Sequence, residues 1–187
     1  MNAIEELKTE HEAVRLALQI LSRMTAEIEE TGKMEKPEHL EQLLEFLTVF
    51  VDTCHHGKEE AFLFPALEAV GVSRKNGPIG VMLKEHQQGR DHVAGMKRAL
   101  SQHVDHNPDM IAKLSHHIKA YTDLLDRHIE KENNALFPLA IQHLPESNWV
   151  VLKNGFDQIE AERIGEGKHE AFHEMLKKLQ DVYIKTA

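Results

Sequence analysis

The chain is short of three kinds of residue, and each shortage excludes a class of protein. Its 187 residues include a single cysteine, Cys54, which rules out an internal disulfide and suits a reducing compartment. Aromatic residues make up only 5% of the chain, which favours helices over sheets. The 22 basic residues are outnumbered by 31 acidic ones and form no cluster, so no nucleic-acid partner is expected.

Long apolar runs and a secretion signal are also missing. No stretch approaches the roughly 20 apolar residues that cross a bilayer, so no membrane partner is expected. The first residues, MNAIEELKTEHEAV, lack the apolar core and cleavage site of a secretory signal. We therefore expect a cytoplasmic protein, long enough for one domain with a full hydrophobic core.

Apolar residues recur at helical spacing in four long segments. Their approximate bounds are residues 4–31, 37–70, 79–105 and 109–143. Gly32 stops the first segment, Pro37 opens the second, and Asn107-Pro108 turns the chain before the fourth. Strand signals are absent, so the sequence predicts an all-α fold.

The chain is less regular after Pro145. Ser147 is expected to cap a helix that ends near Arg163, with residues 165–167 as its break. A last amphipathic stretch carries Phe172, Leu176, Leu179 and Val182. We therefore expect a bundle over residues 1–143 and a helical extension, residues 144–187, packed on it.

Histidine is in surplus, and the histidines belong to a repeat. The chain has 14 of them, ten between His55 and His143. Two motifs occur twice in the same order: Glu10-His11-x-x-x-Arg15 with Glu85-His86-x-x-x-Arg90, and His55-x-x-x-Glu59-x-x-x-Leu63-Phe64-Pro65 with His128-x-x-x-Glu132-x-x-x-Leu136-Phe137-Pro138. A shared helical period would repeat apolar residues but not these polar ones in register. The chain therefore reads as two copies of one helical hairpin.

Helix geometry brings the repeated polar residues to one level. Residues four apart share a helix face, so each His-x-x-x-Glu pair points one way. The helix from His11 to its turn is nearly as long as the helix from the turn back to His55, and the same holds for His86 and His128. Each pair of histidines therefore returns to about the same level. Two such hairpins in a four-helix bundle gather four histidines and two glutamates in the core.

Buried carboxylates need neutralising partners, and two divalent metal ions would supply them. Each ion could take two imidazole nitrogens while the two carboxylates bridge the pair, leaving coordination positions open. Mixed histidine and carboxylate ligation suits iron or manganese, whereas a structural zinc site would more often use cysteines. Iron is the expected metal, with manganese or zinc as alternatives.

The runs HHGKEEAFLFPALEAVG and RHIEKENNALFPLA, with the paired Glu-His motifs, resemble the hemerythrin-like cation-binding family, or HHE domain. The resemblance covers about residues 1–143. It implies an up-down-up-down four-helix bundle and a non-haem di-iron centre with an oxo or hydroxo bridge. The implied metal ligands are His11, His55, Glu59, His86, His128 and Glu132, with both glutamates as bridges.

One position departs from the oxygen carriers of that family, which have a further histidine four residues after the one on the third helix. Here that residue is Arg90. The chain resembles instead the branch with four histidines and two glutamates, which includes proteins of iron–sulfur cluster repair and nitric oxide response. The expected function is binding or reaction of a small molecule such as O₂, NO or peroxide, and a sensor is one of the roles that such binding can serve. The alternative is an iron donor or repair protein for iron–sulfur clusters.

Several other polar residues stay open at this stage. His56 and Glu60 are also four apart, but the second hairpin has Ile129 and Asn133 in their places, which favours His55 and Glu59 as ligands. Arg15 and Arg90 could pair with the bridging glutamates or form surface ion pairs. His169 is a candidate for a seventh ligand, with an exposed polar position as the alternative. Solvated side chains are expected for His103, His106, His116 and His117. Tyr121 is expected in the core, with a hydroxyl beside the site as the alternative, and Cys54 is expected as a small apolar core residue.

Overall fold

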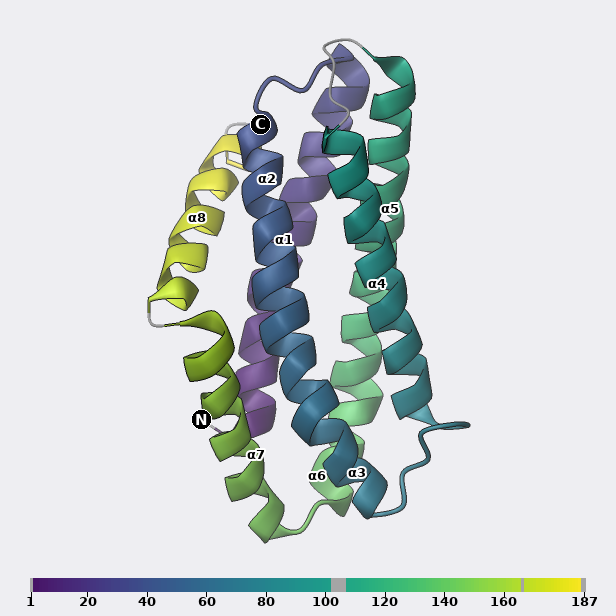
Figure 1. The fold of residues 1–187 in the computed structure, drawn as a ribbon, viewed down its shortest axis with the longest axis vertical. Helices are drawn as coiled ribbons and strands as arrows, with labels where there is room; N and C mark the ends of the chain where they lie inside the picture. The colour runs from purple at the N-terminus through teal and green to yellow at the C-terminus, as the bar shows by residue number, and fades with distance from the viewer. Residues whose placement is uncertain (1, 102–106, 166, 186–187) are drawn as a thin grey trace.

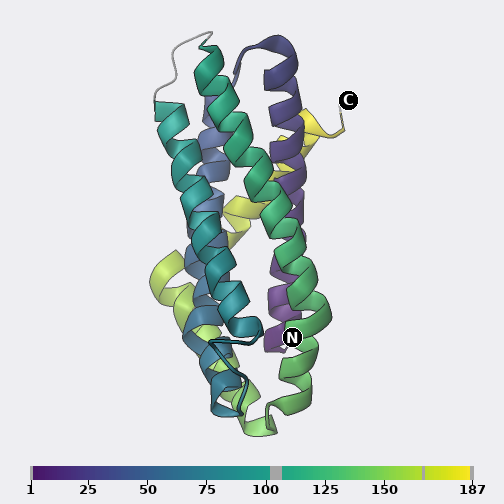
Figure 2. The same cartoon turned by 90° about the vertical axis from the view of Figure 1, so that its right-hand side faces the viewer.

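The computed structural model describes residues 2–101, 107–165 and 167–185, and over these residues it contains helices and no strand. The first three quarters of the chain forms four long antiparallel helical rods (Figures 1 and 2). The rods are α1 (Ala3–Thr31); α2 (Pro37–Phe46) continued by η1 (Leu47–His56), η2 (Glu59–Leu63) and α3 (Phe64–Ala69); α4 (Pro78–Ser101); and α5 (Pro108–Lys131) continued by η3 (Glu132–Leu136) and α6 (Phe137–His143). The predicted all-α, up-down-up-down bundle is confirmed.

The helix starts follow the local sequence. Asn2 caps α1 by accepting a hydrogen bond from the backbone N–H of Glu5, and Gly32 ends the helix in the left-handed conformation. Asn107 caps α5 in the same way. The predicted cap at Ser147 is wrong: the next helix already begins at Glu146, with Pro145 before it and no side-chain cap.

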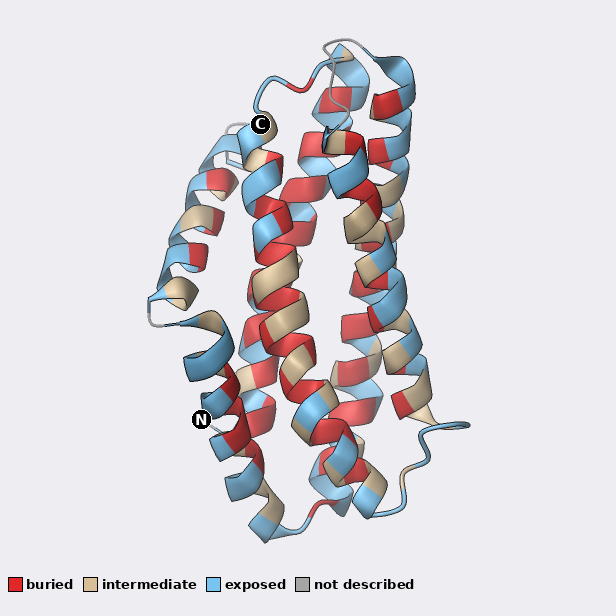
Figure 3. Cartoon of the chain, viewed as in Figure 1, coloured by how far each residue is buried: buried red, intermediate tan, exposed pale blue. Residues whose placement is uncertain are grey.

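The chain ends in two further helices on one side of the bundle. They are α7 (Glu146–Ile159), continued by η4 (Glu160–Ile164), and α8 (Lys168–Tyr183). Both contact α1, and η4 contacts η1 (Figure 1). The buried part of α8 faces the bundle (Figure 3). Its buried residues are Phe172, Leu176, Leu179 and Tyr183, whereas Val182 of the predicted stripe is exposed. The predicted C-terminal helical segment is therefore present and packed on α1 and the second rod.

Four stretches of the described residues are π-helical, and two of them occupy matching places in the two hairpins. η2 starts at Glu59 and η3 at Glu132, and in each the following phenylalanine donates its backbone N–H to that glutamate's carbonyl. The next residue is Pro65 or Pro138, which has no N–H and crowds the preceding turn. The widened turn accommodates the proline, so the repeated Leu-Phe-Pro motif sets the local geometry directly after each glutamate.

The hydrophobic core is split into two clusters. One packs the upper part of the bundle around Leu21, Phe46 and Leu125, and the other packs the lower end around Leu7, Phe64 and Phe137. A layer of buried polar side chains lies between them. No helix of the described residues is long and apolar enough to cross a membrane.

Candidate metal centre

The polar layer is built from the six residues that the sequence singled out. α1 and α4 each supply one histidine, His11 and His86, while the second and fourth rods supply His55 with Glu59 and His128 with Glu132. All six side chains are buried. The repeat therefore brings together four histidines and two glutamates, as predicted.

The histidines face each other in pairs. The Nε2 atoms of His11 and His55 are 3.1 Å apart, and those of His86 and His128 are 3.2 Å apart. Two nitrogens at right angles on one ion, each at about 2.1 Å, would be about 3.0 Å apart. Each pair therefore has the spacing of two ligands to a shared cation.

The glutamates link the two pairs. One oxygen of Glu132 lies 3.1 Å from Nε2 of His11 and the other lies 2.9 Å from Nε2 of His128, so this carboxylate reaches both pairs. Glu59 lies 3.3 Å from Nε2 of His86. Despite these short contacts, none of the four carboxylate oxygens accepts a hydrogen bond. Buried carboxylates left without well-aligned donors are costly, so a bound cation would stabilise the layer.

Each of the four histidines makes a hydrogen bond through Nδ1, the ring nitrogen on the side away from its paired histidine. Within a hairpin, Glu10 accepts from His55 at 2.7 Å and Glu85 accepts from His128 at 3.0 Å. Lys58 then pairs with Glu10, and Lys131 pairs with Glu85. Such outer hydrogen bonds fix the ring and aim Nε2 at the centre.

The other two histidines are held across the hairpins. His86 donates to Glu60 at 2.8 Å, and His11 donates to the side-chain oxygen of Asn133 at 3.2 Å. Glu60 and Asn133 occupy equivalent places in the repeat, so each hairpin accepts a hydrogen bond from a histidine of the other hairpin. Glu60 is thus an outer partner of the centre and not one of the residues gathered in it.

Charge interactions shift the pKa values in this layer strongly. Burial alone would lower the pKa of His128, but Glu132 and Glu85 raise it to about 10. Burial would raise the pKa of Glu10, but His55 and Lys58 lower it to about 2. His86 and Arg90 likewise lower the pKa of Glu60 to about 2. The outer carboxylates therefore stay ionised at neutral pH.

His56 lies next to the layer, which the repeat did not predict. Its ring is buried, stacks on His86 with 3.8 Å between ring centroids, and brings a nitrogen within 4.8 Å of those of His86 and His128. Burial, with His86 and His128 beside it, holds its pKa well below the ordinary value. The cause is local: η1 is π-helical, so successive residues are separated by a smaller angle and both His55 and His56 face the core.

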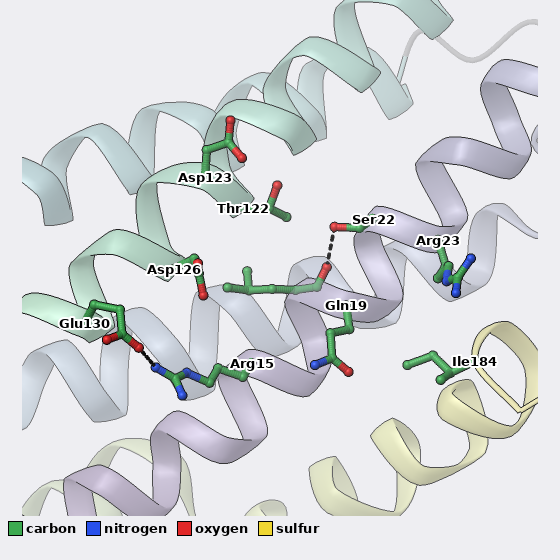
Figure 4. Close-up of a pocket in the computed structure, with 10 residues that line it drawn as sticks. Arg15, Gln19, Ser22, Arg23, Thr122, Asp123, Asp126, Glu130 and Ile184 are labelled. Atoms are coloured by element: carbon green, nitrogen blue, oxygen red, sulfur yellow. Dashed lines mark hydrogen bonds and ion pairs between the residues drawn. The ribbon is translucent and has the colours of Figure 1, made fainter. Parts of the chain in front are cut away.

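Neither of the two repeated arginines pairs with Glu59 or Glu132 in the described part of the chain. Arg90 contacts Asp52 at 2.8 Å and Glu60 at 2.6 Å. Arg15 pairs with Glu130 beside a surface hollow of about 640 Å³ between α1 and α5 (Figure 4). None of the six layer residues lines that hollow. Of the two predictions, the surface ion pair therefore holds for Arg15, while Arg90 supports the centre through Glu60.

His169 does not join the six. It contacts Cys54 at 3.8 Å and Glu160 at 3.6 Å, and these three residues form a second cluster with Glu10, the partner of His55. Cys54 is buried as expected, and burial raises the pKa of its thiol to about 12. Tyr121 is a core residue, and His116 is exposed. His117 is half-buried against His92, while His103 and His106 lie outside the described residues.

Comparison with known proteins places the chain in a family. The profile of the hemerythrin HHE cation binding domain matches residues 2–140. Iron-sulfur cluster repair proteins YtfE from Salmonella paratyphi B and Salmonella newport are each 30% identical over 112 residues, which is 57% of this chain and 50% of theirs. The chain thus spans about half the length of these curated relatives, and no solved structure matches it. With the profile covering three quarters of its length, the chain belongs to the hemerythrin HHE cation-binding family.

Proposed function

We propose that the chain binds two iron ions in the histidine–glutamate layer. His11 and His55 would hold one ion, His86 and His128 the other, and Glu59 and Glu132 would bridge them. The observation that carries the proposal is the set of four buried carboxylate oxygens with no hydrogen-bond donor, set between two histidine pairs. Bound iron would supply Lewis acidity and one-electron redox chemistry, and the surrounding apolar clusters would exclude bulk water.

The proposed role is to bind or react with a small molecule such as O₂, NO or peroxide. Four histidines and two bridging carboxylates leave an iron pair with open positions. Metal analysis of freshly purified chain should give two irons per chain. Azide or peroxide should then produce a new charge-transfer band in the near-ultraviolet or visible spectrum. A chain loaded with iron that gives no band with either reagent would contradict an accessible reactive centre.

A second candidate follows from the YtfE relatives, which are named for iron–sulfur cluster repair. In that role the chain would release iron to a damaged cluster. The iron-loaded chain should then lose iron to a chelator, or to an apo iron–sulfur protein, within minutes. Iron retained under both challenges would exclude the donor role and leave the small-molecule role standing.

A further inference from the structure

A narrow cavity leads from the surface towards the metal centre. It lies between the second rod, α4 and α5, and its volume is about 170 Å³. His56 and Tyr121 line it and are buried, while Asp52 and Arg90 line it with 31% and 34% of their side chains exposed. The ion pair between Asp52 and Arg90 therefore stands on the solvent side, and His56 forms the inner end.

His56 has a nitrogen without a partner at that inner end. Its Nδ1 lies 3.4 Å from a carboxylate oxygen of Asp52, whereas Nε2 is buried and makes no hydrogen bond. A carboxylate only accepts, so Nδ1 carries the hydrogen and Nε2 presents a lone pair. A buried acceptor without a donor is unfavourable, so a molecule with a donor is expected beside it.

The ring orientation distinguishes the His56–His86 contact from the contacts within the two histidine pairs. The rings of His11 and His55 are tilted by 59° with centroids 4.7 Å apart, and those of His86 and His128 by 65° at 4.9 Å. Rings that share an ion diverge in this way because both nitrogens point at one centre. The rings of His56 and His86 are instead nearly parallel, at 16° and 3.8 Å. This stacking does not suit His56 and His86 as two ligands of one ion, although a nitrogen of His56 lies within 4.8 Å of those of His86 and His128.

We propose that this cavity receives the small molecule on which the metal centre acts, and that Nε2 of His56 accepts a hydrogen bond from it. The proposal rests on the proposed function. On this proposal the cavity favours molecules that can donate a hydrogen bond to Nε2 of His56. Hydrogen peroxide has such a donor, whereas azide and nitric oxide do not. Leu47, Val93 and Ala94 make part of the cavity wall apolar, beside the polar Thr48 and Lys97, so the cavity suits a small molecule.

The first test replaces His56 by phenylalanine, which keeps an aromatic ring against His86 but removes both nitrogens. The iron-loaded His56→Phe chain should keep the iron content of the native chain and bind azide with an affinity within about twofold. Its affinity for hydrogen peroxide, from stopped-flow spectra, should fall about tenfold or more, the usual effect of losing one buried hydrogen bond. Loss of iron from the variant would make His56 a ligand and overturn the proposal, as would equal effects on azide and peroxide.

The second test blocks the passage without touching His56. Val93→Phe adds bulk to the cavity wall on α4, and Val81→Phe is a matched control because Val81 is an exposed residue of the same helix. Association of both azide and peroxide should slow about tenfold in Val93→Phe and stay native in Val81→Phe. Native association rates in Val93→Phe would overturn the entry route. A native chain without iron would refute the proposed function itself, whereas a loaded chain unaffected by either variant would refute this inference alone.

Discussion

Two kinds of buried carboxylate lie within a few residues of one another. Glu10 receives hydrogen bonds from His55 and Lys58, so its charge is neutralised by the protein. Glu59 and Glu132 receive none, although they are at least as deeply buried. Burial alone does not mark a metal ligand; a buried charge that the protein leaves without a donor does.

If Glu132 bridges two metal ions as proposed, its removal should lower the amount of bound metal. Glu132→Ala is expected to lower the metal content by at least about half, because both histidine pairs lose their shared oxygen ligand. Loss of bound metal should also lower stability, by about 2.7 kcal/mol where free metal is one hundred times its Kd. Elemental analysis and thermal unfolding would measure both effects.

Glu130→Ala provides the control, since Glu130 lies on the same helix with 54% of its side chain exposed. It should keep native metal content and change stability by less than about 1 kcal/mol. Native metal content in Glu132→Ala would contradict the bridging assignment.

Metal affinity should rise with pH. Glu132 and Glu85 raise the pKa of His128 to about 10, so a metal ion must compete with a proton for this imidazole at neutral pH. Binding must expel this proton, and affinity should change about tenfold per pH unit for each proton released. Titrations at about pH 6 and about pH 8, in buffers of different ionisation enthalpy, would count the protons. Equal affinity at both values would show that His128 is already neutral in the metal-free chain.

At the scale of the elements, one lysine ties three helical segments together. Lys58 has 0% of its side chain exposed and contacts Glu6 and Glu10 of α1 at 2.7 and 2.5 Å and Glu160 of η4 at 2.6 Å. Its equivalent in the second hairpin, Lys131, pairs with Glu85 but has 41% of its side chain exposed. The duplicated motif has thus become a buried tie in one hairpin and a surface pair in the other.

The two lysines should consequently differ in energetic weight. Lys58→Met leaves a buried Glu10 without its cation, so unfolding should become easier by about 3 kcal/mol or more. Lys131→Met removes an exposed pair, for which about 0–1 kcal/mol is expected. Urea denaturation of the two variants side by side is the measurement. Equal losses would mean that burial does not separate these two ion pairs.

At the scale of the whole molecule, the C-terminal helices complete the core. Phe172 of α8 packs edge-to-face on Phe46 at 5.5 Å and on Phe50 at 6.2 Å, inside the upper hydrophobic cluster. The buried face of α8 thus packs on the upper hydrophobic cluster, whereas η4 contacts Lys58 beside the polar layer.

Truncating the Phe172 side chain should destabilise the fold without lowering the metal content of the folded protein. Phe172→Ala is expected to cost about 3–5 kcal/mol, as for other buried phenylalanines, while folded protein keeps its metal. Val150→Ala on α7 is the control, because Val150 is 64% exposed. Thermal unfolding and metal analysis would separate the two effects. If Phe172→Ala unfolds like Val150→Ala, the C-terminal helices add little to the core.

The sequence by itself determined the fold class and the six residues of the central layer. Two copies of one hairpin repeat His, Glu and Pro in register, and helix geometry then leaves those side chains little choice of level. Only the tertiary structure decided what distinguishes the hairpins. The long π-helical η1 turns His56 inward where the second hairpin has Ile129, and the C-terminal helices bury Lys58 but not Lys131. The direction and burial of a side chain depend on the exact winding of its helix and on what packs over it, and a repeated motif specifies neither.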